Sequence, residues 1–315
     1  MIIYNKLLRS NSKTSVALGL FDGIHLGHQA VISKAVDISN PNLVPTVFTL
    51  NNIYKPNSQN KGKDNIISKS QKEILLENIG VKQVYEIEFS SISKLSPQDF
   101  VDTVLVDKLN AKKVVCGFNY HFGFGAKANA YDLKNLCHEK NIDVVIIAPL
   151  NYKENPISST RIKNCIKEAK LDDVKNMLGR YFSFENIVVN GKKLGRTIGI
   201  PTINQDFEEG LIIPKFGVYF SITTHGSKKY CSVTNIGLKP TFEGSKPNIE
   251  TWLIDYNGDD IYGHNVKVEL VKYLREEKKF TCLQDLKNQI LSDASMAKKM
   301  YNNLFDKNHV KNLAL

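Results

Sequence analysis

Hydrophobic and polar positions follow two different patterns along the chain, and the pattern changes near residue 181. Before that point, short apolar runs alternate with segments whose apolar residues recur at helical spacing. The strand-like runs are residues 15–18, 44–48, 81–87, 113–117 and 142–148. Strands that alternate with helices predict a doubly wound parallel α/β sheet. The run 142–148 is expected in the middle of that sheet because of its apolar character.

Helix boundaries in this half carry the usual signals. Ser96 followed by Pro97 predicts a helix start, since serine caps helices and proline favours the first helical position. Gly80 and Gly179 each follow a segment with helical spacing and predict helix ends.

After residue 182 the helical spacing gives way to short β-rich runs separated by turns. These runs are residues 187–189, 217–223, 229–234, 250–255 and 266–273. Closely spaced strands of this kind predict a small antiparallel β-barrel. Only the end returns to helix, where Thr281 and Gln284 form a capping-box pattern. We therefore expect two domains, residues 1–181 and residues 182–315.

Composition narrows the class of protein. With 42% hydrophobic and 23% charged residues the 315-residue chain reads as an ordinary globular protein. Its net charge of +10 suits phosphate-rich ligands, with nucleic acid as the rival partner. The five cysteines are scattered without a Cys-x-x-Cys pair, which disfavours zinc and redox motifs and suits a reducing compartment. No run approaches the length of a membrane span, so we expect a cytoplasmic protein with no membrane contact.

The most informative stretch runs from Gly19 to Gln29, directly after the first strand-like run. Glycine lets a backbone approach a ligand, and a helix N-terminus presents free N–H groups that suit phosphate. His25 and His28 lie three residues apart at this junction, so both can point into one pocket. Imidazole donors there could stabilise charge on a reacting phosphate. Taken alone the pattern stays open, because glycine turns after strands are common and the histidines could be incidental surface residues.

Two further segments bear on the same site. Residues 117–125 form an aromatic, glycine-rich loop after a strand, which on composition alone could equally pack against the sheet. Ser159 is expected to cap a helix, where hydroxyl and N–H groups with Arg161 could bind triphosphate oxygens. The alternative is a capped helix with a surface arginine. Ligands of open α/β sheets bind at the carboxyl ends of strands, which favours a single site.

The residues Phe21-Asp22-Gly23-Ile24-His25-Leu26-Gly27-His28 resemble the His-x-Gly-His signature of nucleotidylyltransferases, in the extended form of bacterial FAD synthetases, the bifunctional riboflavin kinase/FMN adenylyltransferases. The resemblance implies a Rossmann-like nucleotidylyltransferase domain with His25 and His28 as catalytic residues. It implies nucleotide and phosphate binding by Gly19, Phe21, Asp22, Gly23, Gly27, Ser158, Ser159, Thr160 and Arg161. It implies flavin binding by Phe48, Asn119, Tyr120, Phe122 and Gly123. The chain departs from the family at Leu50-Asn51-Asn52, where Pro-His-Pro is usual.

The second half resembles the flavokinases in several places. Residues 195–204, with Gly195, Gly199, Pro201, Thr202 and Asn204, match the nucleotide motif, in which the threonine and asparagine hold Mg²⁺ and ATP phosphates. Glu250 lies in an otherwise apolar run, where a carboxylate is costly unless used or paired, and the family makes it the general base. Arg275 matches a family position near flavin or nucleotide, although a surface ion pair is equally consistent.

The resemblance therefore implies a bifunctional enzyme of FAD biosynthesis. The barrel would phosphorylate riboflavin to FMN with ATP and Mg²⁺, and the α/β domain would transfer AMP from ATP to FMN and release pyrophosphate. We expect small-molecule substrates, no nucleic acid, and a monomer or weak homo-oligomer. Two alternatives remain: a kinase with a weakened adenylyltransferase, because of residues 50–52, and a flavin-sensing RNA-binding regulator, because of the +10 charge.

Overall fold

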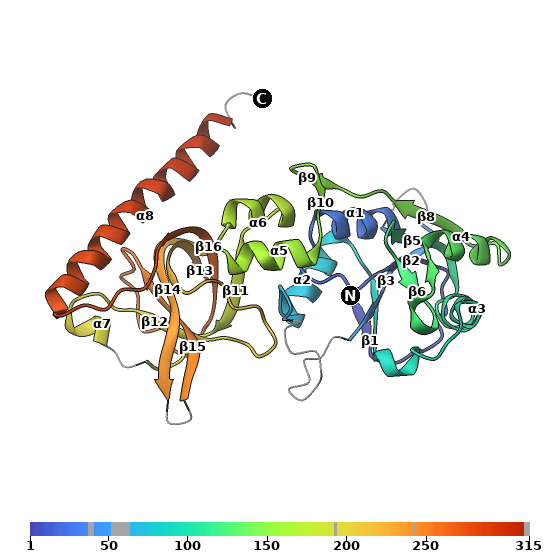
Figure 1. The fold of residues 1–315 in the computed structure, drawn as a ribbon, viewed down its shortest axis with the longest axis horizontal. Coiled ribbons are helices and arrows are strands. Elements are labelled where there is room, and N and C mark those ends of the chain that lie inside the picture. The colour runs from blue at the N-terminus through green and yellow to red at the C-terminus, as the bar shows by residue number, and fades with distance from the viewer. Residues whose placement is uncertain (37–40, 52–63, 192–193, 242–243, 312–315) are drawn as a thin grey trace. The chain divides into compact units, whose positions relative to one another are not determined.

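A computed structural model describes residues 1–36, 41–51, 64–191, 194–241 and 244–311. The chain divides into two compact units, Met1–Ser159 and Thr160–Leu315, and each is described by itself. The element order along the chain can be followed by colour in Figure 1. One residue named above, Asn52, lies outside the described residues.

A parallel sheet forms the centre of the first unit, as the alternation of strands and helices predicts. Within the described residues six strands pair in the order β1-β4-β3-β2-β5-β8, and every pairing is parallel. The strands are β1 Ile2–Tyr4, β2 Thr14–Leu18, β3 Val44–Leu50, β4 Gln83–Ile87, β5 Ala111–Gly117 and β8 Asp143–Ile147. Two small antiparallel pairs accompany them: β6 His121–Phe122 with β7 Ala128–Asn129, and β9 Asn151–Tyr152 with β10 Asn155–Pro156.

The helices of this unit begin and end where local chemistry satisfies their free backbone groups. They are α1 Leu26–Ala35, α2 Lys69–Ile79, α3 Pro97–Asp99 and α4 Ala130–His138, with two 3₁₀ turns, η1 Phe89–Ser91 and η3 Phe124–Ala126, and a π-helical segment, η2 Phe100–Lys108. Ser96 caps α3 through its hydroxyl, as predicted. Gly80 ends α2 in a left-handed conformation, at φ 105°, which glycine adopts without a Cβ penalty.

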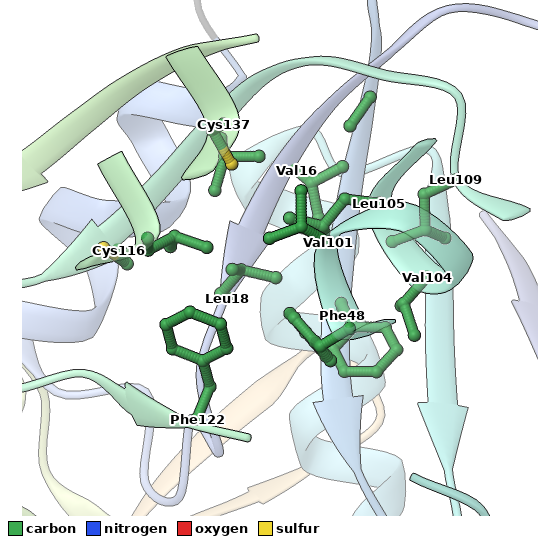
Figure 2. Packing of buried hydrophobic residues seen from close by; sticks show 14 of the residues in the cluster. Val16, Leu18, Phe48, Val101, Val104, Leu105, Leu109, Cys116, Phe122 and Cys137 are labelled. Carbon is green, nitrogen blue, oxygen red and sulfur yellow. The ribbon is translucent and has the colours of Figure 1, made fainter. Parts of the chain in front are cut away.

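Interlocking apolar side chains between the sheet and η2 make the main core of the first unit (Figure 2). Val16 and Leu18 on β2 and Phe48 on β3 face Val101 and Leu105 of η2. Val16, Val101 and Leu105 are completely shielded from solvent. Because β2 and β3 are held rigidly here, the loops at their carboxyl ends start from fixed positions.

The run 142–148 was expected in the middle of the sheet, and this expectation is wrong. Its strand, β8, pairs with β5 at one edge. Asp143 is exposed, and residues 145–147 are only half-buried. The run is therefore apolar because α4 packs on one face of β8, and not because β8 lies between two neighbouring strands.

The second unit contains the predicted antiparallel barrel. Within the described residues six strands pair in the order β11-β16-β13-β14-β15-β12, all antiparallel. The elements are α5 Ser159–Lys167, α6 Leu171–Leu178, β11 Phe182–Ile187, α7 Leu194–Thr197, β12 Ile203–Asp206, β13 Gly217–His225, β14 Lys228–Thr241, β15 Gly244–Leu253, β16 Asn265–Arg275 and α8 Leu283–Lys311.

Side-chain amides join the two edge strands of this barrel. Gln205 on β12 donates from Nε2 to the carbonyl oxygens of Asn186 on β11 (2.7 Å) and Val266 on β16 (2.8 Å). Asn186 donates in return to the Asp206 carbonyl oxygen at 2.8 Å. Gln205 is fully buried, so these bonds replace a backbone ladder and nearly close the barrel.

The two faces of β13 have different chemistry. Its inward positions Ser221 and Thr223 join a buried hydroxyl network with Ser232 and Thr234 of β14, at oxygen–oxygen distances of 2.6–3.0 Å. Its outward positions, Val218, Phe220 and Ile222, form an apolar cluster with Ala294 and Ala297 of α8. The long C-terminal helix thus packs on the outside of the barrel.

Two further expectations for this half need correction. The helix α8 begins at Leu283, so Cys282 rather than Thr281 precedes it, and the Asp285 N–H points to Cys282 Sγ at 3.5 Å. The strand expected at residues 187–189 runs instead over Phe182–Ile187. Among the described residues no helix is long and apolar enough to cross a bilayer.

Candidate active sites

The turn between β2 and α1 brings the predicted catalytic histidines to the carboxyl edge of the parallel sheet. Three of its residues have positive φ: Phe21 (54°), Gly23 (80°) and Ile24 (37°). A Cβ on Gly23 would lie 2.9 Å from the Ile66 side chain, so this position requires glycine both for its backbone and for space. The turn is therefore a strained and tightly packed structure, which is typical of functional sites.

His25 and His28 are held against each other at the start of α1. His25 is the N-cap residue, and its Nδ1 accepts a hydrogen bond from the His28 backbone N–H at 3.3 Å. The two rings stack with centroids 3.6 Å apart, and the Phe21 ring meets His28 edge-on at 5.3 Å. Both histidines thus lie at the positive end of the helix dipole.

The environment keeps His28 neutral. Burial, followed by the nearby His25 and Lys72, lowers the pKa of His28 well below 6.5. Within the described part of the chain, the buried Nδ1 atom of His28 has no hydrogen-bond partner. A buried ring nitrogen without a partner is costly, so a polar ligand group at this position would gain a ready contact.

The predicted phosphate segment reaches the same turn. Ser159 donates from Oγ to the Asp22 carbonyl oxygen at 2.9 Å, and the Asp22 carboxylate accepts from the Ile66 N–H at 2.8 Å. Ser159 was expected to be the helix cap, but it is the first residue of α5 and Ser158 precedes the helix. Its hydroxyl is used to hold the turn instead. Thr160 and Arg161 follow in α5.

Lys72 is a member of this site that the sequence did not reveal. Its Nζ donates to the Leu20 carbonyl oxygen at 2.9 Å and to Thr49 Oγ1 at 3.1 Å, and Thr49 Oγ1 also donates to Leu20. Burial lowers the pKa of Lys72. The ammonium group therefore ties the ends of β2 and β3 together and places positive charge near His28. A lysine inside a helix carries no local signal for such a role.

The predicted flavin residues divide into buried and accessible positions. Phe48 and Phe122 are only 3% and 6% exposed and pack around Phe100, at centroid distances of 5.8 and 5.4 Å. A flavin contact by Phe48 or Phe122 stays a prediction, and the burial of both rings argues against it. Tyr120 is stacked on Phe122 at 5.9 Å and is partly buried.

The remaining two flavin positions belong to the same loop. Asn119 is exposed, and its carbonyl oxygen lies 3.0 Å from His121 Nδ1. Gly123 has φ 75°, and a Cβ there would lie 2.8 Å from Pro97. The loop is therefore anchored against the start of α3, and Asn119 is its accessible polar group.

A second polar cluster lies on neighbouring strands of the barrel. Asn204 on β12 is directly opposite Glu250 on β15. Asn248, two residues before Glu250 on the same face, donates from Nδ2 to Glu250 Oε1 at 3.3 Å and to Asn204 Oδ1 at 3.4 Å. The predicted metal ligand and the predicted base are thus connected through Asn248, which sequence reasoning missed. The backbone comes close on one side, since a Cβ on Gly191 would lie 2.3 Å from Asn204 Nδ2.

The rest of the nucleotide motif forms a compact turn before β12. A Cβ on Gly195 would meet the Ile200 carbonyl oxygen at 2.2 Å, and the Ile200 N–H donates to the Gly195 carbonyl at 2.8 Å. Gly199 has φ 76°, and Pro201 is exposed. Thr202 follows directly, two residues before Asn204. Thr202 offers a hydroxyl and Asn204 an amide oxygen, donor types that suit Mg²⁺.

No alternative metal centre is visible in the described residues, since no three His, Cys, Asp or Glu side chains gather there. Arg275, predicted near flavin or nucleotide, is engaged elsewhere. Its Nε and Nη2 donate to both oxygens of the Asp293 carboxylate on α8, at 2.8–3.1 Å, and its Nη1 donates to the Glu276 carbonyl oxygen. A flavin contact by Arg275 would compete with this pairing.

Comparison with known families assigns the two halves. The family model described as FAD synthetase matches residues 7–161, and the one described as riboflavin kinase matches residues 178–301. The two matches follow each other along the chain, as the two structural units do.

Individual relatives align over almost their whole length. The bifunctional riboflavin kinase/FMN adenylyltransferase of Buchnera aphidicola is 33% identical, with 95% of this chain and 97% of the relative covered. The enzyme of the same name from Bacillus subtilis is 30% identical, with 96% of each covered. A crystal structure titled macrolide-efflux protein, from Streptococcus pneumoniae, superposes with a TM-score of 0.84 at 30% identity and covers 94% of this chain and 98% of that one. Because both domain families and the curated relatives agree, the chain belongs to the bifunctional riboflavin kinase/FMN adenylyltransferases, which make FMN from riboflavin and FAD from FMN.

Proposed function

We propose that adenylyl transfer to FMN takes place at the β2–α1 turn, with His25 and His28 as its catalytic residues. The stacked pair at the start of α1, with the buried Nδ1 of His28 lacking a partner in the described chain, is the observation that supports this most. Imidazole groups at the α-phosphate stabilise the charge that builds up there. The FMN phosphate attacks the α-phosphorus of ATP and pyrophosphate leaves, so no side-chain nucleophile is needed.

We expect the phosphate groups of ATP to have further donors. Backbone N–H groups at the start of α1 and the hydroxyls of Ser158 and Thr160 suit phosphate oxygens. Arg161 adds a guanidinium group, and Lys72 adds a positive charge that the strand ends already hold in position. These proposed phosphate contacts add individual residue roles to the family assignment.

Riboflavin phosphorylation is proposed to take place at the barrel cluster. Glu250 takes the proton of the ribityl 5′-hydroxyl as that oxygen attacks the γ-phosphorus of ATP, and ADP leaves. Thr202 and Asn204 supply hydroxyl and amide oxygens that fit Mg²⁺, which when bound neutralises charge on the ATP phosphates. A domain boundary at residue 181, a cytoplasmic location, a monomeric or weakly homo-oligomeric state and the absence of a nucleic-acid partner belong to the same proposal.

Two separate assays test the assignment of the sites. In the full chain, His28→Ala should lower FAD formation from FMN and ATP about 10²–10³-fold, the scale of losing one stabilising donor, and leave FMN formation from riboflavin unchanged. Glu250→Gln should lower FMN formation about 10²–10⁴-fold and leave FAD formation from supplied FMN unchanged.

Each variant has a matched control. His138→Ala removes an exposed histidine at the end of α4, and Glu185→Gln removes a carboxylate that pairs with Asn265 on the barrel rim. Neither should change either activity. Loss of both activities in His28→Ala, or of neither, would refute the assignment of two independent sites. RNA binding without turnover would instead support the regulator alternative.

A further inference from the structure

Asn248 occupies the centre of the polar cluster on the barrel, although it belongs to none of the motifs read from the sequence. The residue is 5% exposed. Its side-chain nitrogen carries two hydrogens and has two acceptors, Glu250 Oε1 at 3.3 Å and Asn204 Oδ1 at 3.4 Å. Both hydrogens are therefore directed at groups with a proposed part in riboflavin phosphorylation.

The strand geometry explains why this contact is specific. Residues two apart on a strand share a face, so Asn248 and Glu250 point to the same side of β15. Asn204 lies directly opposite Glu250 on β12, which makes it the diagonal neighbour of Asn248. An amide at position 248 can therefore reach both, whereas the interior hydroxyl network uses Thr251, on the other face.

We propose that Asn248 is a positioning residue for riboflavin phosphorylation, because its amide group holds the Glu250 carboxylate and the Asn204 carbonyl in a fixed relation to each other. This inference rests on the proposed roles of Glu250 and Asn204. With one carboxylate oxygen bonded to Asn248, the orientation of the other is set for the substrate hydroxyl. With one lone pair of Asn204 Oδ1 engaged, the other would remain available to hold Mg²⁺ when the ion is bound.

A carboxylate or an apolar side chain at position 248 could not do this. Leucine has a similar size but donates nothing, so Glu250 and Asn204 would be free to rotate. Aspartate has the same shape, donates nothing and adds a negative charge beside Glu250. The backbone ladder between β12 and β15 does not use the side chain at position 248, so we expect both variants to keep it.

The test uses the full chain and steady-state kinetics with riboflavin, ATP and Mg²⁺. Asn248→Leu should lower kcat for FMN formation about 10–100-fold, the scale found for residues that orient metal ligands, while the KM for riboflavin changes less than about threefold. Asn248→Asp should lower kcat at least as much as Asn248→Leu, since its side chain donates nothing to Glu250 or Asn204 and adds a negative charge beside Glu250. FAD formation from supplied FMN should be unchanged in both.

Asn265→Leu is the matched control, because Asn265 donates to a glutamate, Glu185, at 3.1 Å on the exposed rim of the same barrel. Its kcat should stay at the parent value. A kcat for Asn248→Leu within threefold of the parent, or an equal loss in Asn265→Leu, would overturn the inference. A Glu250→Gln variant that keeps full kcat would refute the base assignment and this inference with it. If Glu250→Gln loses kcat for FMN formation and Asn248→Leu does not, only the role of Asn248 is refuted.

Discussion

The buried ion pair between Arg275 and Asp293 should decide whether α8 stays on the barrel. Asp293 is fully buried and Arg275 is 15% exposed at the side chain. Asp293→Ala removes three hydrogen bonds from the guanidinium group and one from Gln289 Nε2, at 3.0 Å. Removing one partner of a buried pair costs about 3–5 kcal/mol, because the other charge stays in a poorly solvated place.

That cost corresponds to a large loss of thermal stability. In a unit of this size about 1 kcal/mol shifts Tm by roughly 2–4 °C, so the barrel of Asp293→Ala should unfold about 6–20 °C lower. Residual riboflavin kinase activity after incubation at rising temperature gives the measurement. Residual FAD formation from FMN, followed in the same samples, should keep the parent profile.

A variant on the same helix provides the control. Lys298 forms an exposed ion pair with Asp255 at 2.8 Å, and both side chains are about half exposed or more. Exposed pairs contribute about 0–1 kcal/mol, so Lys298→Ala should leave the kinase profile within about 4 °C of the parent. Equal shifts in the two variants would show that the Arg275 pair does not stabilise the barrel, and Arg275 would then be free for the flavin contact that its sequence motif implies.

Three further outcomes follow from the first unit. Gly23→Ala forces a Cβ to 2.9 Å from Ile66 at φ 80°, which costs about 1–2 kcal/mol for the backbone alone, and it should reduce FAD formation while FMN formation persists. The lowered pKa of His28 means that only the unfolded chain takes up its proton below pH 6.5, so denaturant stability of this unit should fall as the pH decreases below 6.5, and less steeply in His28→Gln. Burial raises the pKa of Cys116 to about 11 and that of Cys137 to about 12, so mass spectrometry should find both unlabelled by thiol reagents at pH 8 while the exposed Cys282 reacts.

The sequence predicts the class of both domains because periodicity reports burial of one face. It does not predict the order of strands in a sheet, and residues 142–148 show why. The strand β8 lies at the sheet edge beside α4 (Figure 1), and its buried residues share a core with those of α4. A run covered on one side has the same apolar pattern as a run covered on both. The strand β12 escapes prediction for the opposite reason. Ile203 is its one apolar residue, and the strand is held by its pairing with β15 and by the amide of Gln205.

Site residues that are neighbours in sequence could be predicted, and those that meet only in the folded chain could not. His25 and His28, or Thr202 and Asn204, are close in sequence and therefore visible as motifs. Lys72 and Asn248 contact residues brought to them by strand pairing or by helix packing, and no local pattern marks them. Conversely Phe48 and Phe122 match a motif and are buried in the core, because a motif reports which residue is present and not which way its ring points.

The chemistry of the two clusters fits the two attacking groups. The phosphate of FMN is already an anion, so the adenylyl transfer that we propose at the β2–α1 turn needs positive and neutral donors and no base. The structure provides His25, a neutral His28 and the ammonium group of Lys72 there, while the Asp22 carboxylate accepts from the Ile66 N–H. The hydroxyl of riboflavin must lose a proton, so the proposed kinase site needs a carboxylate, and Glu250 provides one with an amide donor to orient it. If the two reactions exchanged sites, each site would lack the group that its reaction requires. Assaying both Glu250→Gln and His28→Ala with riboflavin and with FMN therefore separates the two activities.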